Sequence, residues 1–460
     1  MNSNCEKTIK CMVILAMVLL GMNDHVWAQG TQFPPPSAPT YQLSLRKAIE
    51  IGVENNYDLI LSRERIEEAR GVAFTRLGAM LPNLSGETNY TKRKVFQGQF
   101  GGQDAVSDRR TIYDLRGRLT QNIFNLSLIH QWRSGKTGVE AADLEAEVTR
   151  RDTISTIALL YFEAIRAEAS VVAREANVKL NKELWNMAEG RKAAGAATGL
   201  DVTRAKVQYQ SERQRLLEAV IERNRARLNL IRVMGIPNDT KIVFTDALEL
   251  VDMPPQTPEE AIEIAMDNRV ELQAQDRRQI ETELRLDAIK GERIPSLDVR
   301  GDHGLIGEKF DERFSSYTVG AYLSIPLFDG GQREGRIHET NSQLRQQRIR
   351  TKNLIHQVGL DARDALLTLE SSREQVMVSR ETLELALKEL ELSQKAFAIG
   401  TITHLEIINA QASLAESRDQ AIEALFNFNA ARVNIARSQG RMELLYKEKT
   451  ITAKSFLPGF

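Results

Sequence analysis

A stretch of the chain without proline, residues 129–192, limits the possible folds more than any other feature of the sequence. Between Ile154 and Met187, apolar residues recur about every 3.7 residues, which is close to the undistorted helical period. A helix over the whole stretch would have about 64 residues and would be roughly 96 Å long at 1.5 Å per residue. A compact domain cannot hold such a rod, so we expect it to pack lengthwise against similar helices.

The pattern around this helix occurs twice in the chain. The segment AIEI at Ala48 recurs at Ala261, 213 residues later, and the glycine-containing turn at Gly195 recurs at Gly400, 205 residues later. Other matches keep an offset of 213 up to the first strand of each repeat and of 204 or 205 from the second strand on, because the first repeat has the longer loop. We therefore infer an internal duplication with a period of about 200 residues. The expected boundaries are a first repeat at 43–235, a linker at 236–257, a second repeat at 258–440 and a C-terminal tail at 441–460.

Each repeat also contains two segments with the pattern of a half-buried strand. From Ser316 to Leu327 the odd positions are apolar or aromatic, and the even positions up to Ser324 are small or able to hydrogen-bond. Pro326 lacks a backbone donor, so strand pairing must end near it. We expect strands at about 84–95, 112–124, 297–305 and 316–328, long helices at 129–192 and 332–398, a helix at 43–80 and a loop at 97–110. The predicted fold class is therefore mainly α with β, in a duplicated helix-strand-strand-helix repeat.

The N-terminus has the pattern of a secretory signal peptide. A charged region precedes the apolar run Met12–Leu20, and small residues stand at the expected cleavage position after Ala28. An uncleaved anchor fits the run less well, because a helix that crosses a membrane needs roughly 20 apolar residues. Both cysteines, Cys5 and Cys11, lie inside the expected signal peptide 1–28, so the mature chain would have no thiol chemistry. A Pro-rich, extended leader is expected at 29–42.

Composition and the four strands limit how the mature chain could meet a membrane. Charged residues make up 27% of the chain with a net charge of −1, which gives no reason to expect nucleic acid as a partner. No other run of about 18 or more apolar residues occurs, so a membrane span would have to be built from strands. Four strands leave open edges whose unpaired amides cost several kcal/mol each in lipid, and closed membrane barrels begin at about eight strands. We therefore expect the chain to oligomerise, with eight strands from two copies or twelve from three.

Three features of the sequence carry a family resemblance. They are the duplicated pattern itself, the segment LSIPLFDGG at Leu323–Gly331, and the two turns at Gly195–Ala205 and Gly400–Ile407. Together they resemble the TolC-like outer membrane factor family, over nearly all of the expected mature chain. The resemblance implies a homotrimer in the outer membrane, in which twelve strands form one β-barrel in the outer-membrane lipid and a long α-helical barrel continues it into the periplasm. It also implies two protein partners, a periplasmic adaptor (membrane fusion) protein and an inner-membrane transporter.

The resemblance assigns roles to the two turns, which form the closed periplasmic entrance in that family. The implied adaptor contacts are Ala194, Gly195 and Ala196 in the first repeat and Ile399, Gly400 and Thr401 in the second. The implied entrance residues are Asp201, Glu406 and Asn409. Three copies of Glu406 would favour cations, and Asn409 stands where the family has a second acid. Ile402 stands where some members have an arginine that locks the closed entrance, so the sequence does not reveal how this entrance is locked.

Simpler interpretations of these residues stay open. Asp201 and Glu406 lie close to expected helix starts, where an acid is commonly just a favourable first-turn charge. The glycines could end helices without contacting any partner. Histidines are scattered over unlike segments, and we expect His404, the one near the turns, to be solvated. The sequence contains no metal-ligand spacing, nucleophile motif or phosphate-binding glycine loop, so we expect no enzyme activity and no cofactor.

Three functions are compatible with the sequence. The first is the outer-membrane exit duct of a tripartite efflux system, which passively exports small molecules such as drugs and toxic compounds. The second is the outer-membrane component of type I protein secretion, which would have the same fold and a different cargo. The third, from another class, is a soluble periplasmic coiled-coil scaffold without a pore. The first is the leading interpretation, but the sequence does not discriminate between efflux and protein secretion and does not identify the exported substrate.

Overall fold

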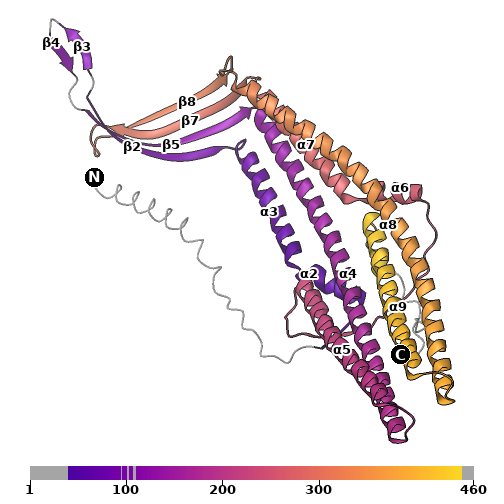
Figure 1. The fold of residues 1–460 in the computed structure, drawn as a ribbon. Coiled ribbons are helices and arrows are strands. Elements are labelled where there is room, and N and C mark those ends of the chain that lie inside the picture. Colours follow the sequence, from indigo (N-terminus) through magenta and orange to yellow (C-terminus); the bar gives the residue numbers. More distant parts are fainter. Residues whose placement is uncertain (1–39, 95, 101–102, 107–109, 448–460) are drawn as a thin grey trace.

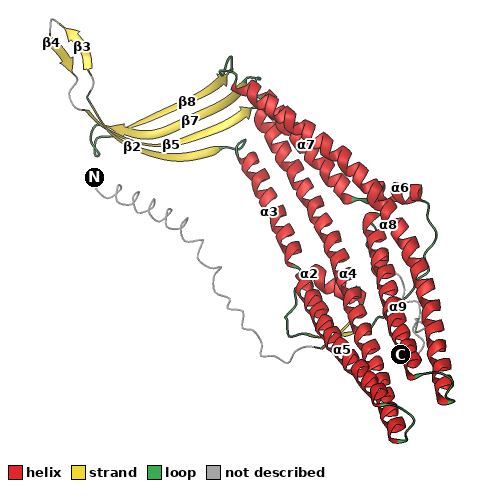
Figure 2. Ribbon diagram, viewed as in Figure 1, coloured by secondary structure: helices red, strands yellow, loops and turns green. Residues whose placement is uncertain are grey.

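The computed structural model describes residues 40–94, 96–100, 103–106 and 110–447. The expected signal peptide, residues 29–39 of the leader and residues 448–460 of the tail lie outside these ranges. The described molecule is elongated, with a β-sheet at one end and long helices running away from it (Figure 1). The helices and the four-stranded sheet occupy separate parts of the molecule (Figure 2), and the predicted class, mainly α with β in a duplicated repeat, is confirmed.

The helices follow the same order in the two halves of the chain. They are α2 (Leu45–Asn55), α3 (Tyr57–Gly78), α4 (Leu126–Ala193) and α5 (Gly199–Met234) in the first half, and α6 (Pro258–Asn268), α7 (Val270–Gly291), α8 (Gln332–Ala398), α9 (His404–Ser438) and α10 (Leu444–Lys447) in the second. With 68 and 67 residues, α4 and α8 are each about 100 Å long. Next to the sheet the helices pack in the order α3–α4–α7–α8, and farther away in the order α5–α4–α9–α8. Within the described ranges, no helix is both long enough and apolar enough to cross a membrane.

The largest apolar core lies near the middle of α4, where α2, α5 and α9 contact it. Tyr161 of α4 is fully buried there, and its hydroxyl donates to Leu43 O at 2.9 Å and shares a hydrogen bond of 2.8 Å with Asp246 Oδ2. Burial, followed by the neighbouring Asp246 carboxylate, raises the pKa of Tyr161, so the phenol keeps its proton and acts as the donor. This contact ties the start of the first repeat to the segment between the repeats.

The leader and the linker are more ordered than the sequence predicted. Residues 40–42 of the expected leader belong to β1 (Thr40–Leu43), which pairs in parallel with β6 (Lys241–Phe244) of the expected linker. Leu43 and Ile242 are buried in the core around Tyr161, so burial of their side chains stabilises the pair. The linker was predicted from the prolines farther along it, and the short strand β6 before those prolines was missed.

A four-stranded antiparallel sheet combines strands from both repeats. Its order is β2 (Asn83–Arg93), β5 (Arg110–Phe124), β7 (Ser296–Gly307) and β8 (Phe314–Ser324), with β2 and β8 at the edges. The register places Leu119 and Val319 in one row across the sheet and Arg118 and Thr318 in the next, so an apolar face and a polar face alternate as predicted. The apolar face has no cover in the single chain, where Val319 is 73% exposed.

Three segments differ from the sequence predictions. The strand expected at 316–328 runs from Phe314 to Ser324, because Pro326 cannot donate to the ladder and pairing stops before it. The helix expected at 43–80 is broken at Asn56, whose side chain caps α3 and donates to Val233 O at 2.8 Å. The segment expected to be a loop, 97–110, contains the paired strands β3 (Phe96–Phe100) and β4 (Gln103–Val106), whose sequence lacks the alternating apolar pattern of the other strands. The other strands and α4 begin and end within about three residues of their expected limits.

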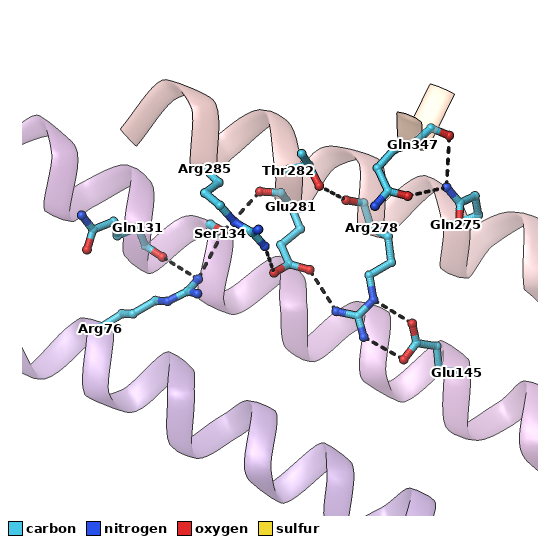
Figure 3. Close-up of polar contacts among 10 residues, drawn as sticks. All are labelled: Arg76, Gln131, Ser134, Glu145, Gln275, Arg278, Glu281, Thr282, Arg285 and Gln347. Carbon is cyan, nitrogen blue, oxygen red and sulfur yellow. Dashed lines mark hydrogen bonds and ion pairs between the residues drawn. The ribbon is translucent and has the colours of Figure 1, made fainter. Parts of the chain in front are cut away.

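On the sheet side of the core around Tyr161, a group of polar side chains joins the two repeats (Figure 3). Arg278 of α7 donates two hydrogen bonds to Glu145 of α4, both at 2.7 Å, and one to Glu281 at 3.0 Å. The Glu281 side chain is only 11% exposed, and Arg285 pairs with it at 3.0 Å. The hydrogen bonds to Glu145 raise the pKa of Arg278, and the two arginines compensate the charge of the buried Glu281. We call these four residues the polar clamp; it fixes α4 of the first repeat against α7 of the second.

Candidate functional site

The two helix turns at the end of the molecule remote from the sheet have the same backbone geometry (Figure 1). After α4 and α8 the chain turns through Gly195 (φ +76°) and Gly400 (φ +82°), in the left-handed region that favours glycine. Gly195 N donates to Lys192 O at 3.0 Å, and Gly400 N donates to Phe397 O at 3.1 Å. Donors and acceptors are both 205 residues apart, so the duplication extends to individual hydrogen bonds.

The helices that leave the two turns are capped differently. At the start of α5, Thr198 N donates to Asp201 Oδ2 at 2.9 Å and Asp201 N donates to Thr198 Oγ1 at 3.3 Å, which completes a capping box. The hydrogen bonds from Thr198 lower the pKa of Asp201, so its carboxylate is ionised. At the start of α9 the corresponding side chains are joined by a longer hydrogen bond of 3.4 Å, from Thr403 Oγ1 to Glu406 Oε1. The second turn therefore constrains its acid less than the first.

The residues to which the resemblance assigned roles gather at this end of the molecule. The expected adaptor contacts are all exposed, and they are Ala194, Gly195, Ala196, Ile399, Gly400 and Thr401. Glu406 and Asn409 are also exposed and lie three residues apart on α9, hence on the same face of the helix. Asp201 is half-buried and engaged in its capping box. A helix-capping role for Asp201 is thus directly visible, whereas entrance and adaptor roles stay predictions.

Behind the exposed turns lies a small apolar cluster that connects the two repeats. It consists of Leu184 of α4, Phe397 of α8 and Ile407 of α9, with the half-buried Ile402 packed against them. We call these four residues the tip cluster. Ile402 stands where the resemblance suggested a locking arginine, and here it adds to apolar packing between the repeats.

The prediction that His404 is solvated is wrong. This first residue of α9 is only 8% exposed, and its ring centroid lies 5.7 Å from that of Phe397. On the same Phe397 ring, Cζ of Arg191 lies 4.0 Å from the centroid. Because Arg191 belongs to α4 of the other repeat, the periodicity of α9 alone could not reveal that His404 is enclosed. Phe397 and Arg191 were also missed, since neither belongs to a recognisable motif.

The end of the molecule at the two turns presents exposed backbone and an exposed carboxylate. Among the described residues, no group of three or more His, Cys, Asp or Glu side chains could hold a metal ion. The two turns offer exposed backbone at Gly195 and Gly400, where no other atom lies within 4 Å of the position that a Cβ would take, so another chain could approach closely. Glu406 adds an exposed carboxylate in the first turn of α9.

A comparison with known protein families decides what the chain is. The model of the family described as outer membrane efflux protein matches residues 52–236 and, a second time, residues 261–441. The chain belongs to the outer membrane efflux protein family. The two matched ranges correspond to the two structural repeats, and the predicted duplication and family are confirmed.

Other members of the outer membrane efflux protein family are distant in sequence and similar in length. The chain is 18% identical to the probable efflux pump outer membrane protein TtgC of Pseudomonas putida, over 90% of this chain and 89% of TtgC. It is 19% identical to the proteases secretion protein PrtF of Dickeya chrysanthemi, over 87% of this chain and 88% of PrtF. Among solved structures it resembles the Campylobacter jejuni CmeC outer membrane channel, with a TM-score of 0.77, 16% identity and coverage of 86% of this chain and 85% of CmeC.

Membership of the outer membrane efflux protein family places the chain in the outer membrane, as predicted, and makes it a transport protein. The third function considered above, a soluble periplasmic scaffold, is therefore wrong. The family includes relatives named for efflux and a relative named for protein secretion, so the family alone does not separate the first two functions.

Proposed function

We propose that three copies of the chain assemble into an outer-membrane exit duct, which an inner-membrane transporter feeds with small molecules through a periplasmic adaptor. One observation carries this proposal: both lateral edges of the chain are suited to pairing with another copy. The sheet ends in the edge strands β2 and β8, and the helical layer ends in α5 and α8. Because the two edges lie on opposite sides of one chain, they can meet only between copies, and such a head-to-tail contact forms a ring when the rotation between copies closes.

The sheet edges supply the first part of the argument. In lipid, each unpaired amide of an edge strand costs several kcal/mol, so β8 of one copy needs to pair with β2 of the next. Three copies supply twelve strands, which is enough for a closed barrel. The exposed apolar face with Val319 and Leu323 would then contact lipid. The opposite face, where Arg116 pairs with Asp302 at 2.5 Å, would line the channel.

The helical edges supply the second part. Exposed apolar residues recur there every seven residues, with one gap on α5. On α5 they are Leu200, Val207, Ile221 and Leu228. On α8 they are Val378, Leu385 and Leu392, and Ile399 continues the series at the C-cap of this helix. A seven-residue apolar repeat is typical of helices that pack along a coiled-coil seam. The stripes on α5 and α8 would therefore meet between neighbouring copies and continue the duct as a helical tunnel.

The two turns would form the entrance of this duct. Three copies of Glu406 would surround the axis and favour cations, and Asn409 would leave the ring with a single acid per chain. The adaptor would contact the exposed backbone at Gly195 and Gly400. The tip cluster, which includes Ile402, would hold the closed entrance by apolar packing in place of an arginine lock.

The cargo is inferred from relatives. TtgC, which matches over 90% of this chain, is named for an efflux pump, and this favours small molecules. Protein cargo is the second candidate, because PrtF matches over 87% of this chain and is named for secretion of proteases. Deleting the gene should raise sensitivity to drugs and toxic compounds while secreted proteins stay unchanged. Loss of secreted proteins with unchanged sensitivity would support the second candidate instead.

Assembly is tested by fractionation of the cell envelope. The chain should be found in outer membranes and migrate as an oligomer in SDS before boiling and as a monomer afterwards. A chain that is released with the periplasm, or runs as a monomer both before and after boiling, contradicts the proposed duct.

A further inference from the structure

His404 is a buried titratable group to which the proposed duct assigns no role. It lies between the two helical hairpins, and its Nε2 has no hydrogen-bond partner in the part of the chain that the structure describes. A neutral imidazole tolerates this position with one nitrogen unpaired. An imidazolium has two N–H donors and a full charge. Burying an unpaired donor costs free energy, and so does burying an unpaired charge.

The charges that face His404 come from two of the three elements packed around it. Arg191 of α4 repels an imidazolium, Asp201 of α5 attracts it, and α8 contributes the ring of Phe397. On α9 itself, Glu406 is exposed and turned to the cap of its own helix, and the positive end of the helix dipole adds to the repulsion. Burial is the main effect and lowers the pKa of His404; Asp201 raises the pKa and Arg191 lowers it by smaller amounts.

The position of His404 makes this charge matter for the entrance. Its ring contacts Phe397, and Phe397 belongs to the tip cluster that packs α4 of the first repeat against α8 and α9 of the second. Water that enters to solvate an imidazolium must separate these apolar side chains. Asp201 of the first hairpin attracts an imidazolium across the same junction, but this effect is smaller than that of burial.

We propose that His404 is a proton-sensitive latch of the entrance: its neutral ring keeps the two hairpins packed, and its protonation separates them and opens the duct. This inference rests on the proposed channel function. In the packed state the pKa of His404 is lowered, so the separated state binds more protons. The packed state therefore has its full stability above about pH 6.5, the ordinary histidine value, and loses it as the pH falls below that value.

Single-channel recording of the purified oligomer in planar bilayers tests the latch. Between pH 7.5 and 5.5, a range above the ordinary carboxylate pKa values, wild-type conductance should rise as the pH falls. The open-to-closed ratio gains up to about tenfold per pH unit for each histidine that titrates. The variants H404F and H404Q, which cannot be protonated, should show no such rise. H338Q is the matched control, because His338 is exposed on α8, and it should behave like the wild type.

The outcomes of this experiment distinguish failure of the latch from failure of the duct. A wild-type channel whose conductance does not change over this range overturns the latch, and so does an acid response that persists in both His404 variants. Two variants are used because a phenylalanine could repack the tip, whereas a glutamine of similar size keeps a polar group there. If the wild-type oligomer shows no conductance at any pH, the proposed duct itself fails.

Discussion

At the scale of single residues, the glycine of each turn is constrained by backbone conformation and not by space. Gly400 has a φ of +82°, and no atom would lie within 4 Å of a Cβ added there. We predict that G400A costs about 1–2 kcal/mol at the turn, because an L-residue is strained in the left-handed region. Hydrogen exchange at the amides of Gly400 and Thr401 should become about 5- to 30-fold faster.

Gly190 provides a control for this prediction. It lies in the last turns of α4 with equally open surroundings but helical backbone geometry. Alanine at this position should stabilise the helix by up to about 1 kcal/mol. If G400A and G190A change the local exchange rate in the same direction, backbone strain does not explain why glycine occupies the turn.

The charge of Glu406 is the residue-scale test of the entrance. E406Q removes three carboxylates from the proposed ring, so the preference of the channel for cations over anions should fall at least about twofold in bilayer recordings. N409D places an acid one helical turn farther along the same face and should raise that preference. If selectivity stays unchanged in both variants, these residues do not line the constriction, and Glu406 is then only a first-turn charge of α9.

At the scale of secondary-structure elements, the exposed stripe of α8 is predicted to be an interface between copies. Leu385 is 60% exposed in the single chain, and burying a leucine contributes about 1.5–3 kcal/mol. L385D should therefore destabilise all three interfaces and lower the temperature at which the SDS-resistant oligomer dissociates. The neighbouring change E384D, at an exposed polar position, is the control. An oligomer that resists L385D as well as E384D would place the stripe outside the interface.

The sequence predicted those elements whose signal lies within the element. Alternation along 316–324 and the helical period of α4 and α8 are local patterns, so these strands and helices could be recognised directly. The pairing of β1 with β6 could not, because paired residues such as Leu43 and Phe244 are about 200 positions apart in the chain. The break at Asn56 was missed for a similar reason, since its side chain is held by α5, far along the chain.

The candidate site, like the fold, was predictable only where its signal lies within one segment of the chain. The turns at Gly195 and Gly400 were found because the duplication repeats them, and glycine in such a turn has a local physical cause. The enclosure of His404 was not predictable, because it depends on how the two repeats pack together. Contacts between repeats are set by the fold as a whole, and no periodicity within one helix encodes them.

At the scale of the whole molecule, the two repeats are joined by contacts of different chemistry on the two sides of the core around Tyr161. On the sheet side, the polar clamp joins α4 to α7 with ion pairs, among them the two hydrogen bonds between Arg278 and Glu145. At the turns, the tip cluster joins them by apolar packing next to His404. Arginine keeps its charge at any physiological pH, whereas histidine does not. A change of pH should therefore loosen the turns while the contacts on the sheet side stay fixed.

Closure into a ring is the last step, and the sheet itself provides the measurement. Within one chain β2 and β8 are separated by three inter-strand spacings of about 4.8 Å, roughly 14 Å in total, while a disulfide needs Cα atoms within about 7 Å. A cysteine at Thr88 of β2, combined in turn with one at Tyr317, Val319 or Ala321 of β8, can therefore be oxidised only to a neighbouring copy. For at least one pair we expect covalent dimers and trimers on non-reducing gels after boiling, whereas the single-cysteine variants should stay monomeric. Bands larger than the trimer would indicate an open filament. Monomers from all three pairs would show that these edges do not meet. A series of covalent species that ends at the trimer is the result that only a closed trimeric ring explains.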